Sequence, residues 1–87
     1  MIRKHIYFSG HVQGVGFRYT VIQLARRFHL TGWVKNLYDG RVEMEVQGKR
    51  EEYECLMQAV KNQFGITQIQ IDNCEIRLNE NEFDLKW

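Results

Sequence analysis

The residues best suited to chemistry lie in one stretch near the N-terminus, SGHVQGVGFRYT, from Ser9 to Thr20. It holds three of the seven glycines and Arg18, and it contains no acidic residue. Glycines let a backbone turn sharply and present its N–H groups to a ligand, and an arginine can donate two parallel hydrogen bonds to a phosphate. We therefore expect an anion-binding loop that Arg18 completes. The alternative is a tight glycine turn with Arg18 as an ordinary surface residue, and spacing alone does not separate the two.

The argument for an anion comes from charge placement, because the loop does not match the common phosphate-binding motifs. No Lys-Ser or Lys-Thr pair follows the glycines, and Tyr19 stands where GxGxxG has its third glycine. The helix predicted to begin at Phe17 has a cation, Arg18, in its first turn, which opposes the helix dipole by about 0.3–1 kcal/mol. The second predicted helix begins with glutamates instead. An anion bound at the start of the first helix would offset this penalty.

The elements that must position this loop follow from hydrophobic periodicity. The predicted strands are 4–8, 30–37, 41–47, 66–78 and 83–87, and the predicted helices are 17–29 and 51–64. Asp39 and Gly40 form a hairpin signal between the second and third strands. In strand 41–47 the apolar residues alternate with polar ones, which predicts a half-exposed strand. The apolar phase of 66–78 slips near residue 72, which predicts a bulge or a break there.

The order of these elements is βαββαβ with a short strand added. This order is typical of a ferredoxin-like α+β sandwich, in which two helices cover one face of an antiparallel sheet. We expect one domain, residues 1–87, since no linker or repeat interrupts the pattern. The fold alone does not give the function, because it serves many.

The charge distribution favours a small anionic ligand. The first 38 residues hold six Lys or Arg and no acidic residue, and all eleven acidic residues follow. A nucleic-acid-binding domain usually has a basic surface over the whole domain, so we expect no nucleic-acid partner. The alternative explanation is chance asymmetry in a short chain.

Other classes of protein are excluded by what the chain lacks. No apolar run approaches the roughly 18 residues of a membrane span, and the first residues, MIRKHIYFSG, contain no apolar stretch long enough to be expected to act as a signal peptide. Cys55 and Cys74 form neither a disulfide framework nor a zinc pattern, and the three histidines lack ligand spacing. We therefore expect a cytoplasmic protein with no membrane partner and no metal. We also expect a monomer without a cofactor, although nothing in the sequence fixes the oligomeric state.

Two blocks of the sequence, GHVQGVGFRY and GWVKNLYDGRVE, closely resemble acylphosphatases in their residues, order and spacing. The C-terminal FDLKW also resembles the end of that family, so the resemblance covers essentially the whole chain. It implies hydrolysis of an acyl phosphate to a carboxylate and inorganic phosphate without a metal or cofactor.

The resemblance also implies roles for individual residues. The family's matching arginine, Arg18 here, binds the phosphoryl oxygens of the substrate, and Asn36 matches the asparagine that holds the attacking water. A phosphate oxygen of the substrate has been argued to accept the proton of that water. The backbone amides of the loop complete the phosphate site and match His11, Val12, Gln13, Gly14, Val15 and Gly16.

The sequence leaves some points open. Asn36 shares a strand face with Val34, but both faces have apolar members, so its direction cannot be derived. His11, Lys35 and Leu37 depart from common family residues, which bears on the rate and the pH profile of the reaction. A non-catalytic module that binds or senses a phosphorylated ligand is the alternative function. An RNA-binding domain of the same general fold is disfavoured, because its aromatic residues should lie on a strand.

Overall fold

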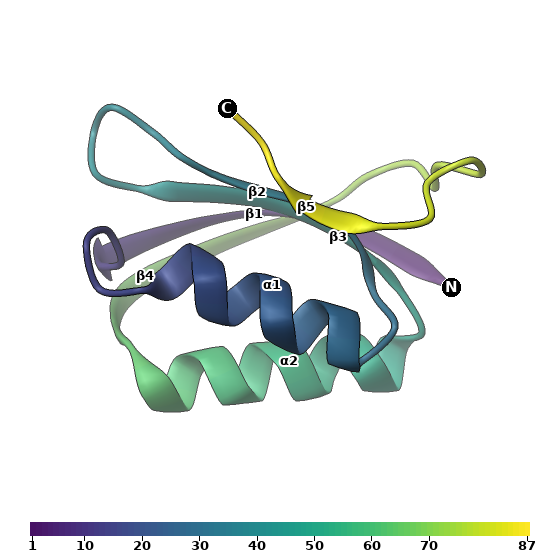
Figure 1. Ribbon diagram of the computed structural model, residues 1–87, viewed down its shortest axis with the longest axis horizontal. Coiled ribbons are helices and arrows are strands. Elements are labelled where there is room, and N and C mark those ends of the chain that lie inside the picture. Colours follow the sequence, from purple (N-terminus) through teal and green to yellow (C-terminus); the bar gives the residue numbers. More distant parts are fainter.

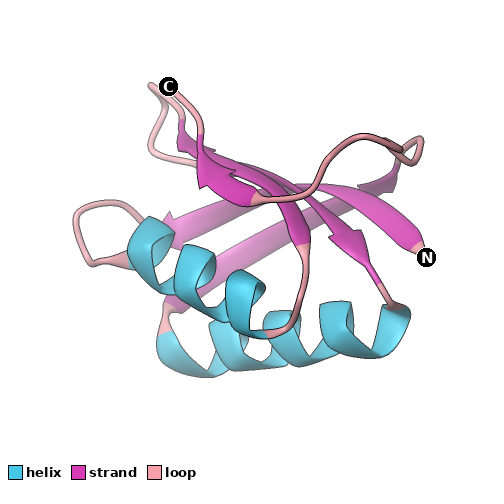
Figure 2. Cartoon of the chain, turned by 45° about the vertical axis from the view of Figure 1, so that its right-hand side comes forward, coloured by secondary structure: helices cyan, strands magenta, loops and turns pink.

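The computed structural model describes residues 1–87 and places two helices on one face of a five-stranded sheet (Figure 1). Figure 2 shows both helices on the same side of the strands. The elements in chain order are β1 (Ile2–His11), α1 (Phe17–Arg27), β2 (Thr31–Asn36), β3 (Val42–Gly48), α2 (Arg50–Gln63), β4 (Gly65–Asn73) and β5 (Phe83–Leu85).

The order of the strands across the sheet is β4-β1-β3-β2-β5. The first four strands pair in antiparallel fashion, which confirms the predicted ferredoxin-like α+β fold. The short strand β5 pairs with β2 in parallel, so the sheet is mixed rather than purely antiparallel. The reason is topological: the chain leaves β4 at one edge of the sheet and crosses to the opposite edge, where it enters alongside β2 in the same direction.

The core lies between the sheet and the helices, as the apolar periodicity predicts. Helix α1 buries the apolar face that carries Phe17, Val21 and Ala25, and helix α2 also buries its apolar face. Phe17 contacts Phe8 of β1 and Phe64 edge-on, with ring centroids 5.0 and 4.9 Å apart. Since edge-to-face pairs stabilise beyond their buried area, this cluster fixes the start of α1 on the sheet.

The crossing segment, residues 74–82, follows the opposite face of the sheet and explains the phase slip near residue 72. Strand β4 ends at Asn73, so the slip marks a break. The N–H of Cys74 donates to the carbonyl of Arg3 at 3.1 Å, and the N–H of Gly32 donates to the carbonyl of Glu82 at 2.9 Å. These bonds fasten the two ends of the segment to β1 and β2.

The polar side of β3 is more buried than its alternation predicts, because residues 74–82 cover it. The fully buried guanidinium of Arg3 donates to Glu45 at 2.7 Å and to both carboxylate oxygens of Glu80 at 2.7 and 3.1 Å. Gln47 is only 4% exposed and exchanges hydrogen bonds with the backbone of Arg77. Burial by itself would raise the pKa of the Glu80 carboxyl, but the hydrogen bonds and charge of Arg3 hold that pKa below its ordinary value.

Replacing Glu80 by glutamine is expected to lower the free energy of unfolding by about 2 kcal/mol, since the change weakens a charge-assisted pair with a buried guanidinium. A lowered pKa stabilises the fold above the ordinary carboxyl pKa of 4.5, and this contribution is lost as pH falls below it. Urea unfolding at pH 7 and pH 3.5 measures both effects. The difference in free energy of unfolding between the wild type and Glu80→Gln should be smaller at pH 3.5 than at pH 7. The control is Asp84→Asn. Asp84 forms an ion pair with Arg26, and their side chains are 59% and 53% exposed, respectively. Such an exposed pair contributes less than about 1 kcal/mol to the free energy of unfolding. Equal losses in both variants would contradict the special role of the Arg3–Glu80 pair.

Candidate active site

The fold brings the start of α1 beside the end of β2. An 11-residue helix is about 16 Å long and the six-residue strand that follows is about 20 Å long. Because β2 returns along the helix, its last residue, Asn36, comes back to the level of Arg18. Val34 is fully buried beneath the helices, and Asn36, two residues later, lies on the same face. The structure thus shows that the side chain of Asn36 points to the helix-covered face of the sheet, which the sequence left open.

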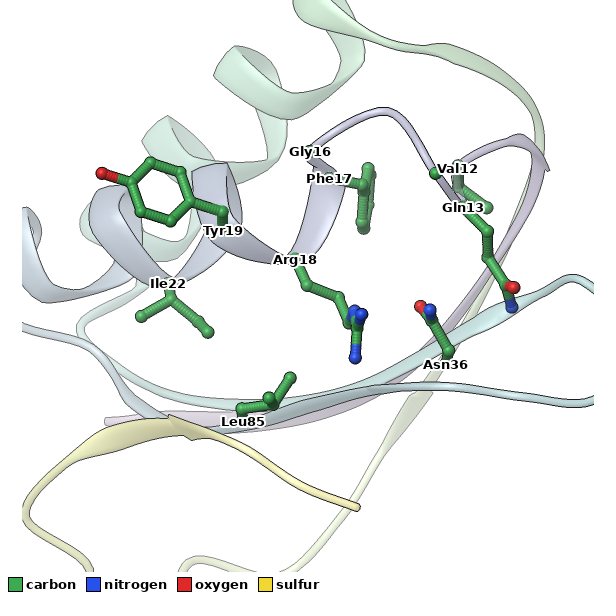
Figure 3. A pocket seen from close by; sticks show the side chains of 10 residues that line it. Val12, Gln13, Gly16, Phe17, Arg18, Tyr19, Ile22, Asn36 and Leu85 are labelled. Atoms are coloured by element: carbon green, nitrogen blue, oxygen red, sulfur yellow. The ribbon is translucent and has the colours of Figure 1, made fainter.

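Arg18 and Asn36 line one pocket of about 320 Å³. Figure 3 shows the guanidinium of Arg18 extending from the first turn of α1 toward the sheet, with the carboxamide of Asn36 directed into the same space. The lining residues come from the loop, α1, β2 and β5: Val12, Gln13, Gly14, Gly16, Phe17, Arg18, Tyr19, Ile22, Asn36 and Leu85.

The charge of Arg18 has no partner within the chain. No acidic residue lies in the first turn of α1, and Arg18 forms neither an ion pair nor a side-chain hydrogen bond, unlike Arg3, Arg26 and Arg41. The helix is preceded by Gly16 in the left-handed conformation with φ 79°, and no side chain caps it. A free cation at an uncapped helix N-terminus is arranged to receive an anion.

The loop backbone supplies a row of hydrogen-bond donors to the same anion. Seven consecutive N–H groups, from Gln13 to Tyr19, have no acceptor within the chain. Gly14 and Gly16 have φ of 74° and 79°, a backbone conformation that other residues adopt only with strain. Backbone N–H groups that converge around positive-φ glycines form an anion-binding concavity.

The side chain of Asn36 has an unused acceptor inside the protein. Its Oδ1 atom is buried and has no hydrogen-bond partner. A buried carbonyl oxygen without a partner costs about 1–3 kcal/mol, so such an atom points to a ligand or a water molecule that donates to it. Asn36 therefore combines with Arg18 in one site that can bind an anion and orient a donor.

The side chain of Gln13 has a role that the sequence analysis did not find. Its Nε2 atom donates to the carbonyls of Leu37 and Arg41, at 2.8 and 2.9 Å. These two carbonyls flank the hairpin turn after Asn36, in which Asp39 accepts from the N–H and the Nε of Arg41. Gln13 thus ties the anion-binding loop to the hairpin that carries Asn36. No sequence signal identifies this, since a loop glutamine has no spacing rule.

Replacing Gln13 by methionine is expected to lower kcat/KM for an acyl phosphate about tenfold, because the loop and Asn36 lose their common anchor and small displacements of reacting groups are costly. The change removes both hydrogen bonds and keeps the size of the side chain. Steady-state kinetics measure the loss, with the exposed residue Gln23 of α1 changed to methionine as the control. Equal kinetics in the two variants would show that Gln13 does not position the site.

The remaining predicted site residues divide between the pocket and its surroundings. Val12 lines the pocket with a buried side chain, but its N–H already donates to the carbonyl of Gly10 at 3.0 Å. His11 and Val15 do not line the pocket, although the N–H of Val15 is one of the seven free donors. Gly10 serves the sheet, because a Cβ there would lie 2.5 Å from the carbonyl oxygen of Gly65.

The chemistry that the pocket offers is positioning and charge stabilisation. No Asp, Glu or His lines it, so no strong general base stands beside Asn36. No three His, Cys, Asp or Glu side chains gather anywhere in the chain in a way that could hold a metal ion. A reaction with a good leaving group suits such a site, because it needs little proton transfer to proceed.

Comparison with known proteins agrees with this geometry. The acylphosphatase family model matches residues 4–85. The acylphosphatase of Geobacillus kaustophilus is 39% identical over 90 residues, which cover 100% of this chain and 96% of that protein. The crystal structure of acylphosphatase from Bacillus subtilis covers 100% of both chains, with 37% identity and a TM-score of 0.91. The T. kodakarensis HypF structure also contains this fold: it is 32% identical with a TM-score of 0.86, and the match covers 100% of this chain and 12% of that one.

The chain belongs to the acylphosphatase family. It is an acylphosphatase, a hydrolase that acts on the acid anhydride between a carboxylate and a phosphate. No helix of the structure has the length and apolar character needed to cross a bilayer.

Proposed function

We propose that the pocket hydrolyses acyl phosphates with Arg18 and the loop holding the phosphoryl group and Asn36 holding the water. The proposal rests on one observation: the unpaired guanidinium of Arg18 and the unpaired Oδ1 of Asn36 line the same pocket, beside a loop with free N–H groups. These groups are complementary to a phosphoryl group and a water molecule.

The free N–H groups from Gln13 to Tyr19 and the guanidinium bind the nonbridging phosphoryl oxygens. Charge spreads over these oxygens in the transition state, so donors fixed in place before the reaction stabilise it. Asn36 Oδ1 accepts a hydrogen bond from the attacking water and aims its oxygen at phosphorus. Because no carboxylate or histidine lines the pocket, a phosphoryl oxygen of the substrate accepts the proton that the water loses.

The products are a carboxylate and inorganic phosphate, and no metal ion takes part. Arg18 supplies the positive charge that a cation would otherwise provide, and the leaving carboxylate needs no protonation at neutral pH. We further propose that the protein works as a monomer in the cytoplasm; two free cysteines, Cys55 and Cys74, fit a reducing compartment. Light scattering during gel filtration measures the oligomeric state.

Hydrolysis of acetyl phosphate and benzoyl phosphate by the wild-type protein, dialysed against a chelator and assayed in its presence, tests the proposal. We expect full activity under these conditions and a competitive inhibition by inorganic phosphate. Activity that requires an added divalent cation would contradict the metal-independent mechanism. Phosphate binding without turnover would instead identify a ligand-binding module of the same fold.

A further inference from the structure

The active-site pocket has two unlike walls. On one side of the Arg18 guanidinium lie the polar side chains of Asn36 and Gln13, and on the other side lie the apolar side chains of Ile22 and Leu85 (Figure 3). The first wall and the loop account for the phosphoryl group and the water. The second wall has no part in that chemistry, so it calls for an explanation of its own.

The apolar wall is built by two elements that the fold holds together beside the site. Ile22 lies four residues after Arg18 in α1, so the two side chains share a helix face. Leu85 lies on β5 opposite Val34 of β2, and Val34 precedes Asn36 by two residues on the same face. The wall is therefore adjacent to Arg18 and is displaced from Asn36 toward the sheet edge that β5 forms.

Hydrogen bonds also join the two elements that form the wall. Arg26 of α1 donates from Nε to the carbonyl of Phe83 at 3.1 Å and from Nη2 to the carboxylate of Asp84 at 2.9 Å. These bonds join α1 to β5 next to Leu85. Phe83 itself is almost fully buried in the core. Ile22 and Leu85 thus present a fixed apolar surface to the pocket, although β5 is only three residues long.

The geometry of phosphoryl transfer indicates what this surface contacts. The attacking and leaving oxygens are roughly in line through phosphorus. The water oxygen forms its bond to phosphorus while the bond to the bridging oxygen breaks, and the electron pair of that bond leaves with the carboxylate. Both protons of the water end on the released phosphate before it equilibrates with solvent. If the water lies at Asn36, the leaving carboxylate lies on the opposite side of the phosphoryl group, toward Ile22 and Leu85.

We propose that Ile22 and Leu85 form a subsite for the acyl group, and that this subsite selects acyl phosphates with an aromatic or branched aliphatic acyl group over small or charged ones. The inference rests on the proposed placement of the phosphoryl group and the water. Apart from Arg18, which the phosphoryl group neutralises, no charged side chain lines the pocket. An acyl group with its own carboxylate or second phosphate would lose hydration against this wall without gaining a partner.

Two acyl phosphates that differ only in the size of the apolar group test the subsite: benzoyl phosphate and acetyl phosphate. Truncation of Ile22 to alanine is expected to lower kcat/KM for benzoyl phosphate about tenfold and to change that for acetyl phosphate less than about twofold. Leu85→Ala is expected to act in the same direction. The control is Leu24→Ala, since Leu24 lies on the same helix and is also partly buried against the core, but it does not line the pocket. It should leave the ratio of the two kcat/KM values unchanged.

A binding measurement on the wild type makes the test independent of folding and of turnover. Phenacylphosphonate and acetonylphosphonate carry a methylene in place of the bridging oxygen and cannot be hydrolysed in the same way. We expect the phenacyl compound to inhibit about tenfold more strongly, and Ile22→Ala to remove most of this difference. Equal inhibition by the two compounds, or equal losses on both substrates in Ile22→Ala and Leu24→Ala, would overturn the subsite while leaving the hydrolysis of acyl phosphates intact. No hydrolysis of either substrate by the wild type would overturn the proposed function itself.

Discussion

Replacement of Arg18 by alanine is expected to lower kcat/KM for an acyl phosphate by about 10³-fold. One preorganised donor to a developing oxyanion contributes a factor of roughly 10²–10³ to the rate, and an arginine that binds the phosphoryl group in the transition state can contribute more than that. The loss should fall on both KM and kcat, because the guanidinium binds the phosphoryl oxygens before and during the reaction. Arg18→Lys keeps the charge but not the two parallel donors, so we expect it to recover only part of the activity.

The same substitution should not destabilise the fold. Arg18 has no acidic partner and opposes the dipole of α1, so Arg18→Ala is expected to leave the free energy of unfolding unchanged or to raise it by about 0.3–1 kcal/mol. A large loss of activity combined with a small gain in stability distinguishes a residue kept for binding from one kept for structure. Phosphate should raise the melting temperature of the wild type and have little effect on that of the variant.

The matched control lies at the other end of the same helix. Arg27 is exposed and lies in the last turn of α1, where a cation complements the dipole. Arg27→Ala should keep full activity and lose a few tenths of a kcal/mol in stability. Kinetic constants for Arg18→Ala within about twofold of the wild type would remove Arg18 from the site.

Replacement of Asn36 by alanine is expected to lower kcat by about 10²-fold with little change in the inhibition constant for phosphate. Asn36 contacts the water in this account and not the phosphoryl group, so the loss belongs to the chemical step. The fold should tolerate the change, because the substitution removes a buried acceptor that has no partner in the free protein.

Asn36→Asp provides a second test of the same assignment. The aspartate is nearly equal in size, but its negative charge faces the phosphoryl oxygens, so phosphate binding should weaken as well as turnover. Asn62→Ala on the exposed side of α2 is the control for removal of an asparagine. An Asn36→Ala enzyme with unchanged kcat, or one that loses phosphate binding as strongly as kcat, would contradict the role given to Asn36.

The sequence predicts most of the fold because its local signals agree with each other. The helical stripes of Phe17, Val21 and Ala25 and of the second helix, together with the Asp39-Gly40 turn, place both helices and most strands within a few residues of their observed bounds. The strand predicted over 66–78 is the exception, since it ends at Asn73. The parallel pairing of β5 could not be predicted, because it depends on the path of residues 74–82 across the sheet. That path in turn depends on the buried Arg3, which reads in the sequence as an ordinary basic residue near the N-terminus.

The site was predictable in its parts and not in its assembly. The absence of acidic residues around Arg18 indicates an anion-binding site, and the family resemblance points to Asn36. Strand alternation alone, however, does not show to which face of the sheet the side chain of Asn36 points. The direction follows from the burial of Val34 beneath the helices, because Asn36 lies on the same face of β2, and this packing is a property of the three-dimensional arrangement. The side-chain roles of Gln13, Ile22 and Leu85 likewise arise from contacts between distant segments.

The central claim is that water attacks phosphorus, while the loop and Arg18 hold the phosphoryl group. Enzymatic hydrolysis of benzoyl phosphate in ¹⁸O-labelled water tests it most directly, with mass spectrometry of both products and a parallel sample without enzyme. The account predicts one labelled oxygen in inorganic phosphate and none in benzoate. Label in the benzoate would mean that water attacks the carbonyl carbon, and it would contradict the placement of the phosphoryl group between Asn36 and the apolar wall.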